Sequence, residues 1–174
     1  MSHSASTTFA IIGAGLAGHS AAEALRRAGF DGRIALIGDE PHLPYERPPL
    51  SKGFLQGSRP AEALALRPAA YYDDLAVELL LGAPVTGIDL QARRLTRGDG
   101  MTLGFDRLLI ATGARPVRLR QPGFDLPGVH YLRTIDDAER LKRNLALAHH
   151  VLVVGAGFIG SGIAASAGLL GRAG

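Results

Sequence analysis

The chain has 174 residues, of which 47% are hydrophobic and 20% charged, with 23 Gly and neither Cys nor Trp. This composition is typical of a globular protein with room for one domain or slightly more, and it excludes a disordered chain. The lack of cysteine excludes disulfides, thiolate metal sites and a redox dithiol, and the net charge of only +3 excludes the dense basic face of a nucleic-acid-binding protein.

The first predicted elements are a strand, a glycine turn and a helix. Residues 9–12 are a short apolar run that meets the glycine cluster of residues 13–18, and residues 16–28 follow helical spacing. The apolar stripe predicted for this helix consists of Ala17, Ala21, Ala24, Leu25 and Ala28. A second strand is predicted over residues 33–37. Two buried strands joined by a helix form a right-handed βαβ unit with parallel strands.

Proline dominates the next segment. Because four prolines between residues 41 and 49 oppose both helix and sheet pairing, this stretch is predicted to be an extended, rigid loop. The turn Gly98-Asp99-Gly100 predicts a reversal of the chain further on. The elements expected in this middle part are short helices over 50–55 and 68–75, a buried strand over 77–81, and an antiparallel meander with strands over 85–90, 94–96 and 101–103.

The final third repeats the opening pattern. An apolar strand is predicted over 107–111, and a capping box at residues 134–137 begins a helix that extends to about residue 146. A strand over 151–154 then leads into a second glycine turn, GAGFIG, which echoes the earlier GAGLAG. The sequence therefore predicts an α/β protein with a Rossmann-like parallel sheet, a small antiparallel meander and the start of a second Rossmann unit.

One segment allows a different interpretation. Residues 151–171 carry no charge over 21 residues, a length that can cross a bilayer. Six glycines and the change from strand-like to helical spacing favour a buried strand, turn and helix instead, with a membrane-associated module as the minor alternative. Because the amino terminus lacks the basic and apolar regions of an export signal, we expect a cytoplasmic protein.

The first glycine turn has the context of a dinucleotide-binding site. It follows a strand, begins a helix and precedes an acid, Asp39, which lies 21 residues beyond Gly18. Gly13 permits the sharp turn, Gly15 lets backbone amides approach a diphosphate, and Gly18 lets the helix press against the strand. The free amides and the positive end of the helix attract the anion. We predict that this turn binds the ADP moiety of FAD or NAD, with Asp39 or Glu40 accepting a hydrogen bond from the ribose.

Five motifs lie in a fixed order along the chain. They are GAGLAG (13–18), IGDEPHLPYERPPLSKGFL (37–55), LLIATGARP (108–116), YLRTIDDAERL (131–141) and VVGAGFIG (153–160). In order and spacing they resemble the FAD-dependent ferredoxin reductases of the putidaredoxin-reductase type, within the pyridine nucleotide-disulfide oxidoreductase superfamily. The resemblance implies that FAD and NAD are the cofactors and that a small iron-sulfur protein, a ferredoxin, accepts the electrons. It implies no nucleic-acid partner and leaves the oligomeric state open.

The resemblance also implies roles for individual residues. Those implied to hold FAD are Gly13, Gly15, Ala17 and Gly18 at the diphosphate, Asp39 at the ribose, Val85 at the adenine, and Arg47, Lys52, Ala111, Thr112, Gly113 and Arg133 elsewhere on the cofactor. Gly155, Gly157 and Gly160 are implied to bind NAD. Lys52 is the implied catalytic residue, because an ammonium near the flavin ring stabilises the negative charge of the reduced form. Arg47 and Lys52 could also be solvated charges beside the proline-rich loop.

The chain departs from the family pattern in two places. Family members continue into a complete NAD-binding domain, whereas this sequence stops at Gly174, so we expect an incomplete NAD site and a chain inactive as a full enzyme. Gly162 occupies the position of a family glutamate that is implied to pair with the lysine corresponding to Lys52. The predicted domains are an incomplete FAD-binding domain over 1–116, a connecting segment and helix over 117–147, and the start of an NAD-binding domain over 148–174.

Two functions therefore compete. The first is an FAD-dependent oxidoreductase that passes electrons from NADH to an iron-sulfur protein, and the alternative is a non-catalytic module that binds FAD or ADP. No metal site is predicted, because the six histidines lack the spacing of metal ligands. No Ser-His-Asp arrangement supports a hydrolase.

Overall fold

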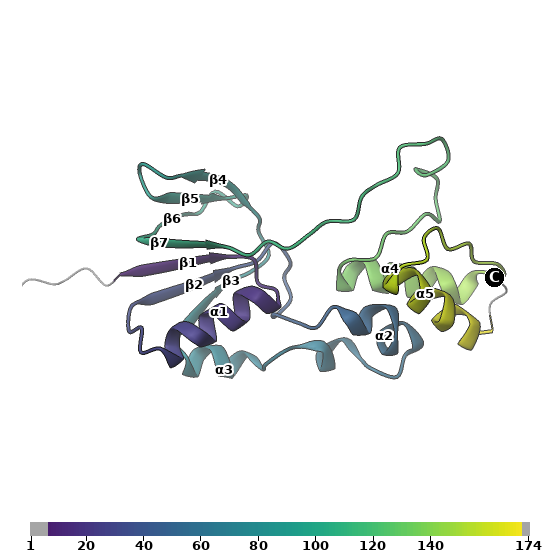
Figure 1. Ribbon diagram of the computed structural model, residues 1–174, viewed down its shortest axis with the longest axis horizontal. Helices are drawn as coiled ribbons and strands as arrows, with labels where there is room; N and C mark the ends of the chain where they lie inside the picture. The colour runs from purple at the N-terminus through teal and green to yellow at the C-terminus, as the bar shows by residue number, and fades with distance from the viewer. Residues whose placement is uncertain (1–6, 172–174) are drawn as a thin grey trace, which may run out of the picture. The chain divides into compact units, whose positions relative to one another are not determined.

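The computed structural model describes residues 7–171, which fold into two compact units. The described residues of the first unit are 7–45 and 65–113, and those of the second unit are 46–64 and 114–171. Figure 1 traces both units in chain order. Each is described here by itself.

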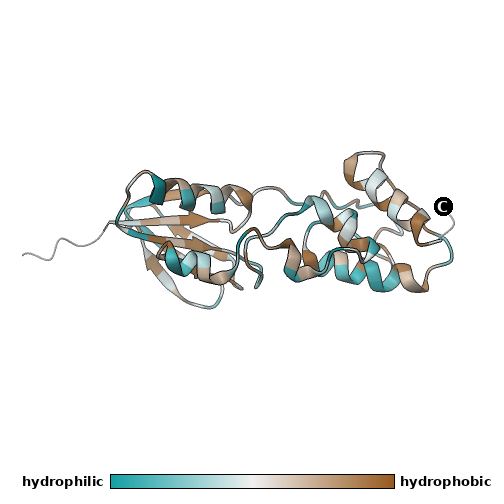
Figure 2. Cartoon of the chain, turned by 90° about the horizontal axis from the view of Figure 1, so that it is seen from below, coloured by the Kyte–Doolittle hydropathy of each residue, from teal (hydrophilic) through white to brown (hydrophobic). Residues whose placement is uncertain are grey.

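A parallel sheet organises the first unit. Its strands are β1 (Thr8–Ile12), β2 (Arg33–Ile37), β3 (Val77–Leu80) and β7 (Arg107–Ile110), in the spatial order β3-β2-β1-β7. All three strand pairings are parallel. The strands are mostly hydrophobic (Figure 2), as expected for a sheet that is covered on both faces. This sheet confirms the predicted Rossmann-like architecture.

Alternate residues of the strands face two different layers. On one face, strand side chains pack against two helices, α1 (Leu16–Arg27) and α3 (Ala69–Asp74). On the other face they pack against the meander of β4 (Val85–Asp89), β5 (Arg94–Arg97) and β6 (Thr102–Gly104). Figure 1 shows these layers on opposite sides of the sheet. The meander is antiparallel in the order β4-β5-β6, which confirms its prediction.

The buried face of α1 differs from the predicted stripe. Gly18, His19 and Ala22 are buried, whereas Ala17 and Ala24 are exposed. The prediction is confirmed for Ala21 and Leu25, which are half-buried and pack against the core. It was wrong for the exposed alanines because the helix turns its smallest residue toward the sheet, which brings its backbone close to the strand, and because a polar side chain is buried with partners from another element. The spacing of hydrophobic residues within one helix predicts neither the close approach at Gly18 nor the burial of His19.

The second unit is helical. Its elements are the 3₁₀ helices η1 (Pro48–Ser51) and η2 (Ala61–Leu64) and the α-helices α2 (Gly53–Gln56), α4 (Ile135–Leu147) and α5 (Phe158–Leu169). Leu55, Leu141, Leu145 and Ala167 form its core. The Thr134 hydroxyl accepts from the amide of Asp137, and the Asp137 carboxylate accepts from the amide of Thr134, so the predicted capping box is confirmed.

The proline-rich segment ends earlier than predicted. Residues 48 and 49 already belong to η1, because a proline ring presets the backbone angle of a first helical turn and its missing amide is not needed there. Tyr45 also forms an isolated antiparallel bridge with Ala65. Only the part of this segment before the 3₁₀ helix is a loop.

The strand predicted over 151–154 does not form, since those residues pair with no strand in the described part of the chain. The glycine turn that follows nevertheless has the geometry of the first turn. Gly155 and Gly13 share a φ of 114°, and an added Cβ on Gly160 would lie 2.1 Å from the Gly155 carbonyl oxygen. Such a turn is determined locally, whereas a parallel strand requires neighbours that are distant in sequence.

No helix among residues 7–171 combines the length and the apolar character needed to cross a membrane. The uncharged stretch over 151–171 contains a helix of only 12 residues, α5.

Candidate functional site

The first glycine turn joins the carboxyl end of β1 to α1. The amide of Gly13 donates to the carbonyl of Ile37 at 2.7 Å, which holds the turn against β2. An added Cβ on Gly13 would lie 2.2 Å from the Ala111 carbonyl oxygen, and one on Gly18 would lie 1.9 Å from the Gly13 carbonyl oxygen. An added Cβ on Gly15 would meet nothing within 4 Å. Two of the glycines are therefore required by packing, and the third borders open space.

The amides at the start of α1 are available to an anion. The first hydrogen bond of the helix runs from the amide of His19 to the carbonyl of Gly15 at 3.0 Å. Within residues 7–171, no side chain caps this helix end, and the amides of residues 16–18 have no hydrogen-bond partner. The helix also has no acidic residue in its first turn. Unpaired amides beside the free space at Gly15 fit the diphosphate of a dinucleotide, so the geometry of this turn is compatible with the predicted cofactor.

The two acids after β2 differ in their surroundings. Asp39 is exposed at the carboxyl end of the strand. Glu40 is half-buried, and its carboxylate accepts a hydrogen bond from the Tyr45 hydroxyl at 2.6 Å. Of the two, the Asp39 carboxylate is therefore the one open to a ribose hydroxyl.

Val85 and the segment 111–113 lie at the same end of the sheet as the glycine turn. The amide of Ala111 donates to the carbonyl of Ile12 at 2.7 Å. A cavity of about 380 Å³ lies between β4 and the ends of β1 and β7, and its lining includes Val85 and Thr112. Ile110, a further lining residue, is 60% exposed. The structure thus brings Gly13, Val85 and Thr112 together at the carboxyl edge of the parallel sheet, where ligands of such sheets bind.

The remaining predicted residues belong to the second unit. The Arg47 guanidinium donates to the carbonyl of Arg133 at 2.6 Å, so these two residues are in contact. Lys52 is exposed, and no carboxylate of residues 7–171 lies within ion-pair distance of its ammonium. An added Cβ on Gly162 would lie 2.9 Å from the hydroxyl oxygen of Ser51, the residue that precedes Lys52 in the sequence.

A buried polar cluster between α1 and α3 was not predicted. His19 Nδ1 lies 3.0 Å from the Tyr72 hydroxyl, and the Glu23 carboxylate accepts from the Tyr71 hydroxyl at 2.5 Å. The His19 and Tyr72 rings meet edge to face at 5.7 Å. The spacing of His19 and Glu23 by four residues and the adjacent tyrosines were the available signals. The cluster anchors the first turn of α1.

The ionisation of this cluster makes the first unit sensitive to acid. Burial lowers the pKa of His19, an effect that the carboxylate of Glu23 opposes and Arg67 reinforces. The hydrogen bond from Tyr71 lowers the pKa of Glu23, and burial raises the pKa of Tyr72 to about 12. At neutral pH the imidazole is thus neutral and the carboxylate charged.

We predict that the first unit loses stability as the pH falls below 6.5. The unfolded chain then protonates His19 while the folded chain does not, so the free energy of unfolding falls until the pH passes the folded-state pKa. Glu23 adds a separate loss below pH 4.5. Urea unfolding between pH 7 and pH 5 measures the first effect. His19→Gln should flatten this dependence and the exposed His149→Gln should not; equal slopes in all three proteins would contradict the assignment.

Comparison with known proteins decides the family. The model of the pyridine nucleotide-disulphide oxidoreductase family matches residues 7–173. The chain belongs to this family. Although the family name refers to a disulphide, the 174 residues contain no cysteine, so these residues cannot form a redox disulphide.

Two reductases are among the family members that the chain resembles. The chain is 51% identical to rhodocoxin reductase of Rhodococcus erythropolis, over 90% of this chain and 37% of that protein. It is 44% identical to the ferredoxin–NAD(+) reductase subunit of a benzene 1,2-dioxygenase system from Pseudomonas putida, over 93% of this chain and 39% of that protein.

The solved structures that this chain resembles also include ferredoxin reductases. A ferredoxin reductase from Rhodopseudomonas palustris superimposes with a TM-score of 0.90 at 44% identity, over 95% of this chain and 41% of that one. The reductase in a covalent putidaredoxin reductase–putidaredoxin complex gives 0.84 at 38% identity, over 96% and 40%. The chain thus spans about two fifths of the length of these family members.

Proposed function

We propose that this chain is the FAD-binding part of an NADH-dependent ferredoxin reductase. The observation that carries the proposal is the open amide turn at the start of α1, with an exposed acid at the end of β2. The reductases named above support the same activity, since ferredoxin and NAD(+) appear in the name of one of them. The proposal assigns the protein to the cytoplasm.

In this proposal the chain's own residues hold and orient the cofactor. The amides of residues 16–18 bind the diphosphate, Asp39 accepts from the ribose, and Val85 with residues 111–113 borders the adenine end. Arg47 and Arg133 contribute further contacts. Gly155, Gly157 and Gly160 form the corresponding turn for NAD. Bound FAD supplies hydride acceptance from NADH and release of single electrons.

The proposed partner is a small iron-sulfur protein. One structural neighbour was solved as a covalent complex with putidaredoxin, and the names of several relatives contain ferredoxin. Single-electron release from a flavin suits an acceptor with an iron-sulfur cluster.

The test is turnover of the purified chain with NADH and an artificial electron acceptor, measured with and without FAD. Acceptor reduction that requires both NADH and FAD supports the reductase. Binding of FAD without turnover is the outcome expected of a chain whose NAD site is incomplete, and measurable turnover would exclude the non-catalytic nucleotide-binding module. Failure to bind FAD would contradict both functions.

We propose Lys52 as the residue that stabilises the reduced flavin. Lys52→Gln should slow reduction of the bound flavin by dithionite by up to about tenfold, because one ammonium in a partly solvated site contributes on the order of 1 kcal/mol. The affinity for FAD should change by less than about threefold, since the charge acts on the reduced state. Stopped-flow reduction of the FAD-loaded protein measures the first quantity. An unchanged rate, or an equal change in Lys142→Gln, would contradict the role.

A further inference from the structure

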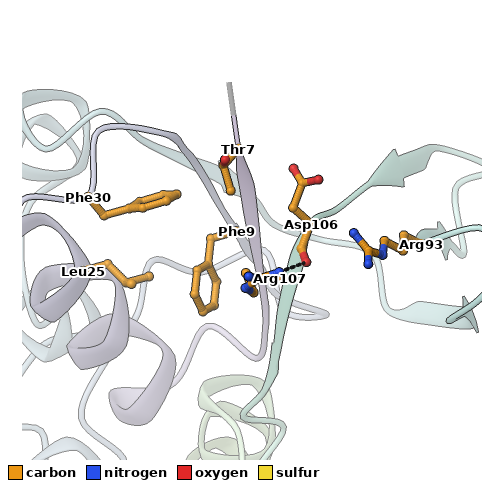
Figure 3. A pocket seen from close by; sticks show the side chains of 7 residues that line it. All are labelled: Thr7, Phe9, Leu25, Phe30, Arg93, Asp106 and Arg107. Carbon is orange, nitrogen blue, oxygen red and sulfur yellow. Dashed lines mark hydrogen bonds between the residues drawn. The ribbon is translucent and has the colours of Figure 1, made fainter. Parts of the chain in front are cut away.

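We propose that a cavity at the amino ends of β1 and β7 binds a small organic carboxylate with an aromatic or branched apolar body. The cavity measures about 450 Å³ and lies within the first unit. It is lined by Thr7, Phe9, Leu25, Phe30, Arg93, Asp106 and Arg107 (Figure 3). Its volume falls within the range of small-molecule sites. The proposal is independent of the function proposed above.

This cavity is separate from the dinucleotide site. Thr7 precedes β1 and Gly13 follows it, and six residues of extended chain span about 20 Å. None of the residues assigned to FAD or NAD belongs to the lining. A ligand here would therefore leave the glycine turn free.

An apolar wall forms one side of the cavity. Phe9 and Phe30 meet edge to face, with ring centroids 6.1 Å apart. The Arg26 guanidinium lies 5.9 Å from the centre of the Phe30 ring and donates to the carbonyls of Phe30 and Gly32, which fixes the chain that carries this ring. Phe9, Leu25 and Phe30 are half-buried, so part of each side chain remains available to a ligand. Such a wall favours an aromatic or branched apolar group.

The polar rim has a surplus of positive charge. Asp106 is already engaged, because its carboxylate accepts from the amide of Thr8 at 2.7 Å. Arg107 donates to the carbonyl of Asp106 at 3.2 Å, the bond drawn in Figure 3. Within residues 7–171, neither Arg93 nor Arg107 has a carboxylate within 4 Å. A guanidinium presents a planar fork of donors that matches a carboxylate, so the rim selects an anion of this shape.

The backbone of Arg93 is preorganised. It has a left-handed φ of 49°, a conformation that is uncommon for residues other than glycine. The amide of Phe105 donates to its carbonyl at 2.9 Å, and the preceding turn is held by two bonds to the Asp89 carboxylate. Glycine at position 93 would remove the guanidinium and relieve the backbone strain together, so Arg93→Gly should remain folded.

The experiment is an amide chemical-shift titration of the isotope-labelled chain with benzoate. We expect saturable shifts at Thr7, Phe9 and Asp106 with a dissociation constant on the order of 1 mM, as suits a ligand of this size. Benzamide, which keeps the ring but lacks the charge, should bind at least tenfold more weakly. Acetate, which keeps the charge but lacks the ring, should also bind at least tenfold more weakly.

Two variants and a matched control complete the test. Arg93→Gly and Arg107→Gln should each weaken benzoate binding by about fivefold, as expected for loss of one charge-assisted hydrogen bond. Arg94→Gln, at an exposed neighbouring position outside the lining, should change it by less than twofold. The proposal is overturned by absence of saturable binding, by equal affinity for benzoate and benzamide, or by shifts confined to residues 13–18.

Discussion

Replacing Gly18 with alanine is expected to destabilise the first unit by about 3 kcal/mol or more, a large part of the 5–15 kcal/mol that stabilises a typical domain. The new Cβ would lie 1.9 Å from the Gly13 carbonyl oxygen and 3.0 Å from the Leu36 side chain. The first of these atoms is backbone and cannot rotate away, so α1 would have to separate from the sheet. The gain in helix propensity, about 1 kcal/mol, is too small to offset this clash.

Urea unfolding followed by circular dichroism measures the effect. With a typical denaturant slope, the midpoint should fall by roughly 1–3 M. Gly168→Ala is the matched control, because it also lies in a helix and its added Cβ meets nothing within 4 Å. That control should keep or slightly raise the midpoint. A midpoint for Gly18→Ala within about 0.3 M of the original protein would show that the helix does not press against the turn as described.

Replacing Gly15 with alanine should weaken FAD binding by between about tenfold and a hundredfold while the protein stays folded. Its backbone φ of −90° suits any residue, and an added Cβ meets no protein atom within 4 Å. The methyl group would instead occupy the space beside the open amides where the diphosphate is proposed to lie. Overpacking of 1–3 kcal/mol at the ligand corresponds to this range of affinity. Fluorescence titration with FAD measures it.

The matched control for this prediction is Gly157→Ala in the second glycine turn. Gly157 also precedes the first residue of a helix, and its added Cβ also meets nothing within 4 Å. Because the second turn is assigned to NAD, this variant should bind FAD with unchanged affinity. Equal losses of FAD affinity in the two variants would contradict the assignment of FAD to the first turn. Unchanged FAD affinity in both variants would show that the diphosphate does not occupy the space beside Gly15.

Local patterns predicted most of the elements. The strand, turn and helix at the start appear as Thr8–Ile12 and Leu16–Arg27, close to the expected 9–12 and 16–28. Thr134 and Asp137 form the expected capping box. In both cases the determining contacts lie within a few residues along the chain, where spacing and side-chain type are sufficient evidence.

The incorrect predictions concern residues whose burial or strand pairing depends on contacts that are distant in the sequence. His19 is buried on α1 because its hydrogen-bond partner, Tyr72, comes from a helix 53 residues away, which the spacing of α1 alone does not report. The stretch 151–154 has the composition of a strand but pairs with none among residues 7–171. For the candidate site, sequence indicated the glycine turn and Asp39, while the cavity beside Val85 became visible only once β4 and β7 were placed in the same unit.

The most direct test of this account is a competition titration of the purified chain with FAD. If the amides of the first glycine turn bind the diphosphate of an adenine cofactor, FAD should bind at one equivalent and ADP should displace it. Riboflavin, which lacks both the diphosphate and the adenine, should not displace it. Displacement by riboflavin and not by ADP, or the absence of saturable FAD binding, would contradict the account.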